Sequence, residues 1–374
     1  ARFFEHYQGA GTERLLQGWA DIDPRLRIVP KREFNALPKW RRKLRRYLGG
    51  GWKPLPLPWE GVSRPGAAPG PWQRGSPCNP FVFHPFDRTH PMNARNTLDF
   101  LLYDWIQVHS LGERPRFADH SRETFDAVLD TCERIAREKY APFNRLVDTQ
   151  EPQFDGEKVI LPQATHEAQK AYAASGMLSA AQDYDIGGMQ LPYTVEAAAN
   201  SFFAMASVSI GSGMLTTGNA NLLMVHGTEV QKQVFALNEF SGRWSGTMCL
   251  SEPQAGSSLS DVATRAVPDG EGFESDPLGP RYRLKGNKMW ISAGEHELTE
   301  NIIHLVLAKI PGPDGKPVPG TRGISLFIVP KKLVDTDGQL TGERNDVALA
   351  GLNHKCGWRG TTNTLLNFGE GKYP

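Results

Sequence analysis

The order of patterned segments along the chain predicts an α+β fold, with an N-terminal all-α helical domain followed by an antiparallel β-barrel or sheet domain. Helical spacing of apolar residues dominates from about residue 93 to residue 243, and alternating or β-branched segments follow from Trp244. Helices grouped before strands favour this class over a doubly wound sheet. No Gly-x-Gly-x-x-Gly links a strand to a helix, so a Rossmann-type site is not expected.

Charge is distributed unevenly along the 374 residues, although the net charge of the whole sequence is only +1. Residues 1–92 carry a net charge of +9, the basic run KWRRKLRRYLGGG at 39–51, and 13 of the 28 prolines. Because proline at this density interrupts helices and sheets, we expect residues 1–92 to be a basic, proline-rich and poorly ordered extension. The alternatives are a basic arm for nucleic acid or membrane and an organellar targeting peptide.

Helical patterns fill the middle of the chain. The alanine-rich segment at 193–209 has few charges on any face, so we expect Phe202, Phe203 and Met205 to lie in the core rather than at a cofactor. The predicted helices are 96–108, a long helix from Asp119 or Ser121 to Tyr140, 163–175 after Pro162, 193–209, and about 229–238.

Strand patterns fill the rest of the chain after Trp244, where turn residues separate short alternating or β-branched runs. The Gly286-Asn287 pair within LKGNKMW is typical of a two-residue hairpin, so we expect a turn there. The predicted strands are 244–251, 261–267, 282–293, 302–310, 323–330, about 346–352, and 363–368.

Cysteine and histidine spacing indicates neither a metal site nor a disulfide framework. The scattered cysteines favour a reducing compartment, and no apolar run approaches the ~18 residues of a membrane-spanning helix. Without a secretory h-region, we expect a cytoplasmic location, with the mitochondrial matrix as the alternative. The cysteines are Cys78, Cys132, Cys249 and Cys356. The histidines interpreted as structural are His226, His296, His304 and His354.

Two stretches carry residues suited to binding chemistry: GTMCLSEPQAGS at 246–257 and KMWISAG at 288–294. The first runs from a short apolar strand into a polar turn, whose free backbone N–H groups and hydroxyls suit a pyrophosphate or a carbonyl oxygen. The second places the flat ring of Trp290 close to the hydroxyl of Ser292, which suits a tricyclic heteroaromatic cofactor. The alternative is that both are ordinary strands of a half-buried sheet.

Together the two stretches resemble the acyl-CoA dehydrogenase flavoprotein family, whose motifs are a hydroxyl-E-P-x-A-G-S loop and a K-x-W-I-[ST] strand. Further matches are GTEVQKQ at 227–233 and HKCGWRGTTNT at 354–364, so that the resemblance covers roughly residues 95–374. APFNRL, GEKVILP and YDIGGMQLP are most similar to the large 3-methylmercaptopropionyl-CoA dehydrogenase-like subgroup. The resemblance implies an N-terminal α domain at 93–243, a middle β domain at 244–374, and no C-terminal helical bundle before Pro374.

The resemblance also assigns residues to an FAD site. Met248, Leu250 and Ser251 would lie along the flavin, with Ser251 bonding its pyrimidine edge, although Met248 stands where many members have an aromatic residue. In the same loop, Glu252 would be structural rather than an acid or base, and Gln254 replaces a common glycine. The remaining assignments are Ser257 at the pyrophosphate or the pantetheine arm, Trp290 beside the isoalloxazine, Ser292 near N5, and Gly256 and Ile291 as further cofactor-binding residues.

The implied activity is FAD-dependent α,β-dehydrogenation of an acyl-CoA thioester to the trans-2-enoyl-CoA. The resemblance implies a glutamate base in the bundle, beyond Pro374, so no catalytic residue is assigned in this sequence. Expected partners are acyl-CoA, electron-transferring flavoprotein as acceptor, and further copies in a dimer or tetramer; a membrane or nucleic-acid partner is not expected. The alternatives are an acyl-CoA oxidase, a flavin-binding DNA-associated member, or a non-catalytic fragment.

Overall fold

The computed structural model describes residues 94–211 and 213–373, so the expectations for residues 1–92 lie outside the described part. The first of two compact units ends at Ile106, and in its described residues, 94–106, helix α4 (Ala94–Asp99) continues into the π-helical turn η2 (Phe100–Trp105). This confirms most of the helix expected at 96–108. It ends early because Gln107 adopts a left-handed backbone conformation with φ of 56°.

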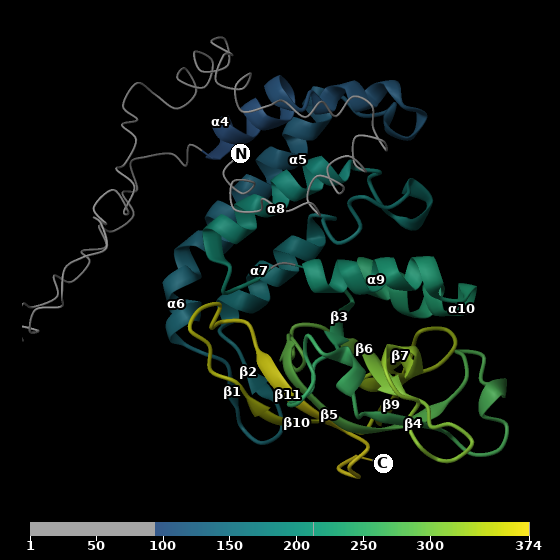
Figure 1. Cartoon of the computed structure of the whole chain (residues 1–374). Helices are drawn as coiled ribbons and strands as arrows, with labels where there is room; N and C mark the ends of the chain where they lie inside the picture. Colours follow the sequence, from purple (N-terminus) through teal and green to yellow (C-terminus); the bar gives the residue numbers. More distant parts are fainter. Residues whose placement is uncertain (1–93, 212, 374) are drawn as a thin grey trace, which may run out of the picture. The chain divides into compact units, whose positions relative to one another are not determined.

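The second unit, residues 107–373, begins with helices and continues with strands (Figure 1). Its α-helices are α5 (Arg122–Ile135), α6 (Asn144–Thr149), α7 (Gln163–Ala174), α8 (Tyr193–Ser207), α9 (Met214–His226), α10 (Glu229–Gln231) and α11 (Leu237–Phe240). Its shorter helical segments are η3 (Val108–Glu113), η4 (Pro115–Phe117), η5 (Ala136–Tyr140), η6 (Ala141–Phe143), η7 (Tyr184–Ile186), η8 (Lys232–Ala236), η9 (Leu259–Asp261), η10 (Phe273–Ser275) and η11 (Thr321–Gly323).

The helix limits follow from local sequence. Ser121 caps α5 in a capping box with Thr124, and the helix continues through η5 to Tyr140 as predicted. Phe202 and Phe203 of α8 are buried, as predicted. The expectation for Met205 is wrong, because this side chain is 47% exposed.

Helix α9 was not predicted from the sequence. Its letters, MLTTGNANLLMVH, contain apolar or small residues on both faces, so no amphipathic period marks it. The structure buries Ala220 and Leu223 on one face and exposes Met214 and Val225 on the other.

The strands form one seven-stranded sheet and two small hairpins. The order in the large sheet is β10-β11-β5-β4-β6-β3, with β7 also paired to β6. The strands are β1 (Gln153–Phe154), β2 (Val159–Ile160), β3 (Trp244–Cys249), β4 (Arg265–Pro268), β5 (Tyr282–Ser292), β6 (Asn301–Lys309), β7 (Ile324–Pro330), β8 (Lys332–Val334), β9 (Leu340–Arg344), β10 (Val347–Leu352) and β11 (Asn363–Phe368).

The α+β class is confirmed, but the sheet is mixed rather than wholly antiparallel. Strand β3 pairs with β6 in parallel, from Trp244↔Asn301 to Cys249↔Val306, and β4 meets β6 in parallel at Arg265↔Lys309. Parallel strands need a long connection, and the segment between β3 and β6, which includes β4 and β5, is long enough to bring β6 alongside β3 in the same direction.

The hairpin expected at Gly286-Asn287 is wrong. Strand β5 runs straight through both residues, which pair with Phe368 and Asn367 of β11. The glycine is needed for close packing instead, because a Cβ atom on Gly286 would lie 2.4 Å from Oγ1 of Thr264.

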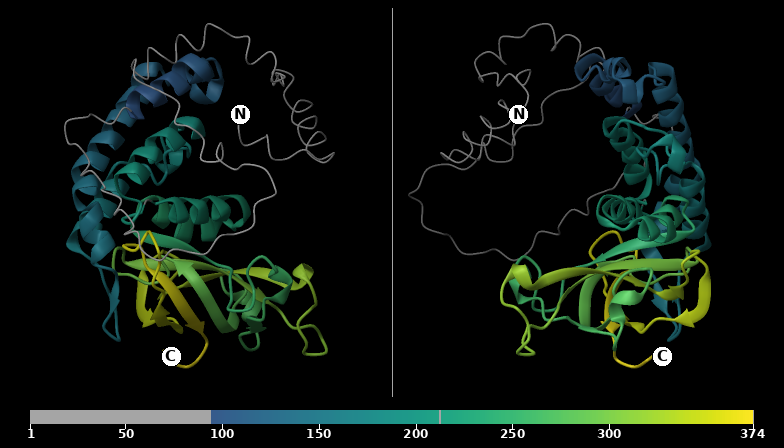
Figure 2. Two further views of the ribbon diagram at one scale, coloured as in Figure 1. Left: turned by 60° about the vertical axis from the view of Figure 1, so that its left-hand side comes forward. Right: turned by 90° about the vertical axis from the view of Figure 1, so that its right-hand side faces the viewer.

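Helix α9 lies against the sheet at β3 and fixes the position of that strand (Figure 2). The buried Asn219 amide of α9 donates to the carbonyl oxygens of Thr247 (3.1 Å) and Ile303 (2.9 Å). A Cβ atom on Gly246 would lie 2.5 Å from Asn219, so glycine permits this approach. The helix thereby holds β3 and β6 together just before the chain leaves β3 at Leu250.

Candidate functional site

The two stretches singled out in the sequence lie side by side where β3 ends. The Met289 N–H donates to the carbonyl oxygen of Ser251 at 3.0 Å. The Lys288 ammonium donates to the carbonyl oxygen of Leu250 at 3.1 Å and to the Glu252 carboxylate at 2.8 Å. Consecutive residues of β5 therefore bind consecutive residues of the loop that follows β3.

Glu252 is buried and its carboxylate is fully occupied. It accepts hydrogen bonds from Lys288, from the Thr264 N–H and hydroxyl, from the Ala263 N–H, and from the Gln254 amide. Burial raises the pKa of Glu252, but hydrogen bonds from Lys288 and Thr264 outweigh it and hold that pKa below the usual value. A carboxylate so ionised and so occupied is not a free base, which confirms the structural role predicted for Glu252.

Lys288 is fully buried, which is rare for a lysine. Burial lowers its pKa, and the adjacent Glu252 carboxylate opposes that shift. The position of Lys288 on the inner side of β5 follows from its partner, because an unpaired ammonium there would be strongly unfavourable.

A β-bulge follows Lys288 and turns the Trp290 ring outward. Lys288 pairs with Leu366 and Ile291 pairs with Thr364, so Met289 and Trp290 together oppose the single residue between those partners. Trp290 has φ of 60° and is 53% exposed. A bulky residue in this left-handed region is strained, and such strain is concentrated at functional sites. The bulge leaves Trp290 and Ser292 exposed while Lys288 and Ile291 remain buried.

The loop after Glu252 presents free backbone donors. Gly256, Ser257 and Ser258 are exposed, and within the described residues their N–H groups donate no hydrogen bond. A Cβ atom on Gly256 would meet nothing within 4 Å, so the space beside it is open. Successive free N–H groups in a turn form a favourable site for an anion.

The other residues predicted for the site occupy intermediate or buried positions. Met248 is partly buried and packs against the core cluster that contains Ile303 and Leu305. Leu250 and Ser251 are also partly buried. The Ile291 side chain is 3% exposed and packs in the core, so it does not form part of the exposed surface.

His296 and His304 are buried near the sheet and form hydrogen bonds inside the protein. His304 Nδ1 lies 2.7 Å from the Thr247 hydroxyl, and His296 Nδ1 accepts from the Leu298 N–H. Burial lowers the pKa of both His296 and His304 to about 3 and raises the pKa of the Cys249 thiol to about 12. The structural role predicted for His296 and His304 is confirmed.

The described part of the chain shows neither a metal site nor a membrane span. Among residues 94–211 and 213–373, no three His, Cys, Asp or Glu side chains gather as a metal ion would require. Within the same ranges, every helix is too short or too polar to cross a bilayer.

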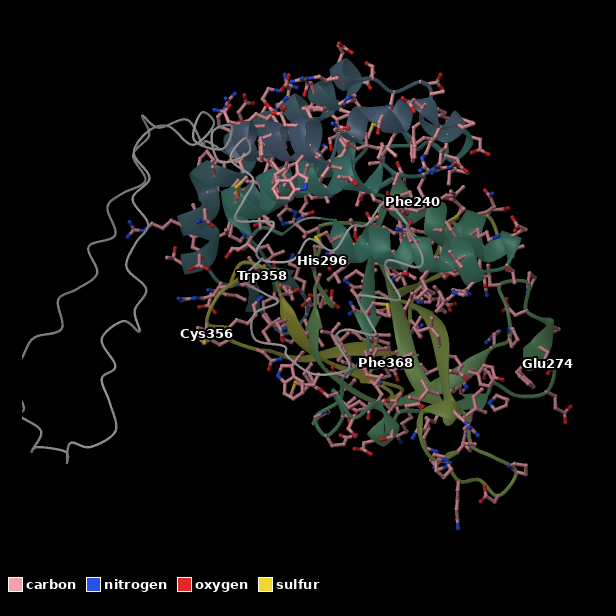
Figure 3. The ribbon with its side chains drawn as sticks, turned by 45° about the horizontal axis from the view of Figure 1, so that its top comes forward. Phe240, Glu274, His296, Cys356, Trp358 and Phe368 are labelled. Atoms are coloured by element: carbon pink, nitrogen blue, oxygen red, sulfur yellow. The ribbon has the colours of Figure 1, made fainter. Side chains whose placement is uncertain are left out.

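Two features of interest were not anticipated from the sequence. Trp358, which is labelled in Figure 3, lies in the loop between β10 and β11. It has φ of 57° and is 60% exposed. Helices α8 and α9 also expose apolar side chains to solvent. These are Tyr193 and Met205 of α8, and Met214, Leu215 and Val225 of α9. The absence of Lys, Arg and Asp from the sequences of both helices could have indicated such faces.

Comparison with known proteins places the chain among related sequences. Residues 122–241 match the family described as acyl-CoA dehydrogenase, N-terminal domain. The chain is 36% identical over 269 residues to 3-methylmercaptopropionyl-CoA dehydrogenase of Ruegeria pomeroyi and 35% identical over 278 residues to butyryl-CoA dehydrogenase of Syntrophomonas wolfei. These matches cover 71% and 73% of this chain and 43% of each relative, so the chain spans less than half the length of either.

The fold is also similar to that of a solved structure. Butyryl-CoA dehydrogenase of Megasphaera elsdenii superposes with a TM-score of 0.50 at 20% identity, covering 68% of this chain and 58% of that one. At 20% identity, this similarity shows a shared fold and nothing further. The sequence relatives, the matched N-terminal domain and the two sequence motifs that meet at the end of β3 all indicate the same family. The chain belongs to the acyl-CoA dehydrogenase family.

Proposed function

We propose that this chain is the helical and β part of an FAD-dependent acyl-CoA dehydrogenase, an oxidoreductase that acts on CH–CH bonds. The reaction would convert an acyl-CoA thioester to the trans-2-enoyl-CoA. The observation that carries the proposal is the meeting of the Ser251–Ser257 loop with the bulge at Trp290, which places a flat ring, hydroxyl groups and free N–H groups on adjoining segments.

The residues present fit FAD. The exposed ring of Trp290 offers a face for the isoalloxazine, and the hydroxyls of Ser251 and Ser292 offer hydrogen bonds to its polar edges. The free N–H groups of Gly256 and Ser257 suit the pyrophosphate, with the Ser257 hydroxyl also available to the pantetheine arm of the substrate. FAD, when bound, supplies the acceptor for the hydride that leaves the acyl group.

The protein's own contribution is to bind, orient and exclude water. Trp290 would cover one side of the cofactor site, because its bulge holds the ring outward in one orientation. Hydrogen-bond donors aimed at the thioester carbonyl would stabilise an enolate developing there. Glu252 is excluded as the base because Lys288 and Thr264 occupy its carboxylate.

The base in this proposal is a glutamate of a helical domain that packs on α8 and α9 in the complete protein. The exposed apolar faces of these helices, with Tyr193, Met205, Met214 and Val225, are suited to such a contact. We include in the proposal a dimer or tetramer, electron-transferring flavoprotein as the acceptor, and a cytoplasmic location. The names of the relatives support an acyl-CoA substrate.

The test uses the protein expressed from its complete reading frame. We expect it to copurify with FAD, and we expect anaerobic addition of methylthiopropionyl-CoA or butyryl-CoA to bleach the flavin absorbance. Trp290→Ala and Ser292→Ala should each weaken flavin retention, since they remove ring contact and a hydrogen bond. Fast reoxidation by electron-transferring flavoprotein and slow reoxidation by oxygen would support a dehydrogenase rather than an oxidase. A protein that neither holds nor responds to FAD would contradict the proposal.

A further inference from the structure

We infer that Glu252 and Lys288 form a positioning pair that sets the distance between the Ser251 loop and the Trp290 bulge. The inference rests on the proposed function, because its consequence is the shape of the proposed FAD site. Neither residue would touch the cofactor. Both would act through Ser251, Trp290 and Ser292, which they hold in place.

The first support is the pattern of bonds between the two segments. Lys288 binds Leu250 and Glu252, and the next residue, Met289, binds Ser251. Each of the three consecutive loop residues therefore has a partner at 2.8–3.1 Å on β5. A shift of either segment along the other would disturb both the backbone bond of Met289 and the two bonds of the Lys288 ammonium.

The second support is the place of Lys288 immediately before the bulge. In a regular strand, Lys288, Trp290 and Ser292 would share one face. The extra residue instead leaves Lys288 inside while Trp290 and Ser292 point outward. The buried ion pair anchors the strand on the inner side, where it can hold the strained conformation of Trp290 on the outer side.

The third support is that the Glu252 carboxylate also bonds residues at the start of β4. Glu252 also accepts from the Ala263 N–H and from Thr264, which precede the first residue of β4. Thr264 in turn packs against Gly286 of β5. One carboxylate thus joins the end of β3, the start of β4 and the inner side of β5.

The chain contains a second buried pair that serves as a matched control. Lys331 binds Glu295, and the side chains of both are 3% exposed. The further partners of this pair are Glu297, the His296 carbonyl oxygen and Arg344. None of these contacts involves 246–257 or 288–292, so removal of Lys331 tests the loss of a buried pair without moving the proposed site.

The experiment compares Lys288→Met with Lys331→Met in the protein expressed from its complete reading frame. FAD dissociation constants are measured by flavin fluorescence, bound-flavin absorption spectra are recorded, and thermal unfolding is followed in parallel. We expect Lys288→Met to weaken FAD binding about 10- to 100-fold and to shift the bound spectrum, the range of affinity loss typical when a residue that orients a binding group is removed. Lys331→Met should lower the unfolding temperature but leave FAD affinity and spectrum unchanged.

Equal FAD affinity for Lys288→Met and the parent would overturn the inference. Equal losses of FAD affinity in Lys288→Met and Lys331→Met would also overturn it. If Lys288→Met does not fold, Thr264→Val decides, because it removes a hydrogen bond to Glu252 while the ion pair remains. Weaker FAD binding by Thr264→Val then supports the inference, and parental affinity overturns it. Failure of the parent itself to bind FAD would instead refute the proposed function.

Discussion

Glu252 and Glu239 are both buried glutamates, with 2% and 0% exposure, yet the structure gives them opposite surroundings. Glu252 accepts five hydrogen bonds, and these hold its pKa below the usual value against the effect of burial. Both carboxyl oxygens of Glu239 lack a hydrogen-bond partner within the described residues, and burial alone raises its pKa well above the usual value. The supply of donors, rather than burial, decides the direction in which each pKa shifts.

The positions of the two residues explain this difference. Glu252 follows β3, where unpaired N–H groups and the inner lysine of β5 converge. Glu239 lies on α11, whose Phe240 belongs to a core cluster with Leu223 and Trp244. The carboxylate with many donors therefore connects strands, and the carboxyl without donors is enclosed where helix and sheet pack.

The largest expected effect comes from breaking the ion pair at Glu252. Lys288→Met should lower the free energy of unfolding by about 3–5 kcal/mol, because it leaves a buried carboxylate without its counter-charge. Urea unfolding monitored by circular dichroism measures the loss. A loss below about 1 kcal/mol would show that the remaining donors satisfy Glu252 without the lysine.

The same substitution at the two glutamates should have opposite signs. Glu239→Leu removes an unpartnered buried carboxyl and should raise the free energy of unfolding by about 1–3 kcal/mol. Glu252→Leu should lower it, because Lys288 then loses its counter-charge. Parallel urea titrations of the two variants measure both effects. Destabilisation by both would contradict the claim that Glu239, unlike Glu252, is unfavourable in its surroundings.

The pH dependence should also differ in sign. The pKa of Glu239 is raised in the folded state, so its favourable contribution is present below the usual value of 4.5 and is lost as pH rises through the folded-state pKa. The pKa of Glu252 is lowered, so its contribution is present above 4.5 and is lost as pH falls through the folded-state pKa. In urea titrations between pH 4 and pH 8, the advantage of Glu239→Gln over the parent should grow with pH. For Glu252→Gln the titrations extend below pH 4, because its penalty should stay constant above about 4.5 and shrink as the pH falls through the lowered folded-state pKa.

A smaller effect is expected at the strained bulge that the Glu252 pair supports. Trp290→Gly should be more stable than Trp290→Ala by about 1 kcal/mol, because glycine adopts the left-handed conformation without a Cβ penalty. Thermal unfolding of the two variants measures the difference. Greater stability of the alanine variant would indicate that Trp290 does not keep its positive φ in solution.

Much of the fold could be predicted from the sequence because local patterns specify it. The cap at Ser121 and the buried Phe202 and Phe203 follow from helical periodicity and capping chemistry. The parallel pairing of β3 with β6 could not be predicted, because it depends on contacts between distant segments. Gly286 was misread as a turn because its tight packing partner, Thr264, is not adjacent in sequence.

The candidate site could be predicted in part. The motifs identified Ser251, Trp290 and Ser292, but the bulge that turns Trp290 outward depends on its pairing with β11. The role of Lys288 was missed because a lysine in an alternating strand is normally exposed. The limits proposed for the α domain at 93–243 and the β domain at 244–374, and the assignment of individual residues to FAD, remain predictions.

The central claim, that the Trp290 bulge forms one wall of an FAD site, has a direct test in a pair of tryptophans. Trp290 and Trp358 are both more than half exposed and both have left-handed φ values, 60° and 57°. FAD dissociation constants should be measured for Trp290→Ala, Trp358→Ala and the parent protein. We predict weaker binding by at least about 10-fold for Trp290→Ala and parental binding for Trp358→Ala. Parental affinity in Trp290→Ala would contradict the placement of the flavin at this bulge.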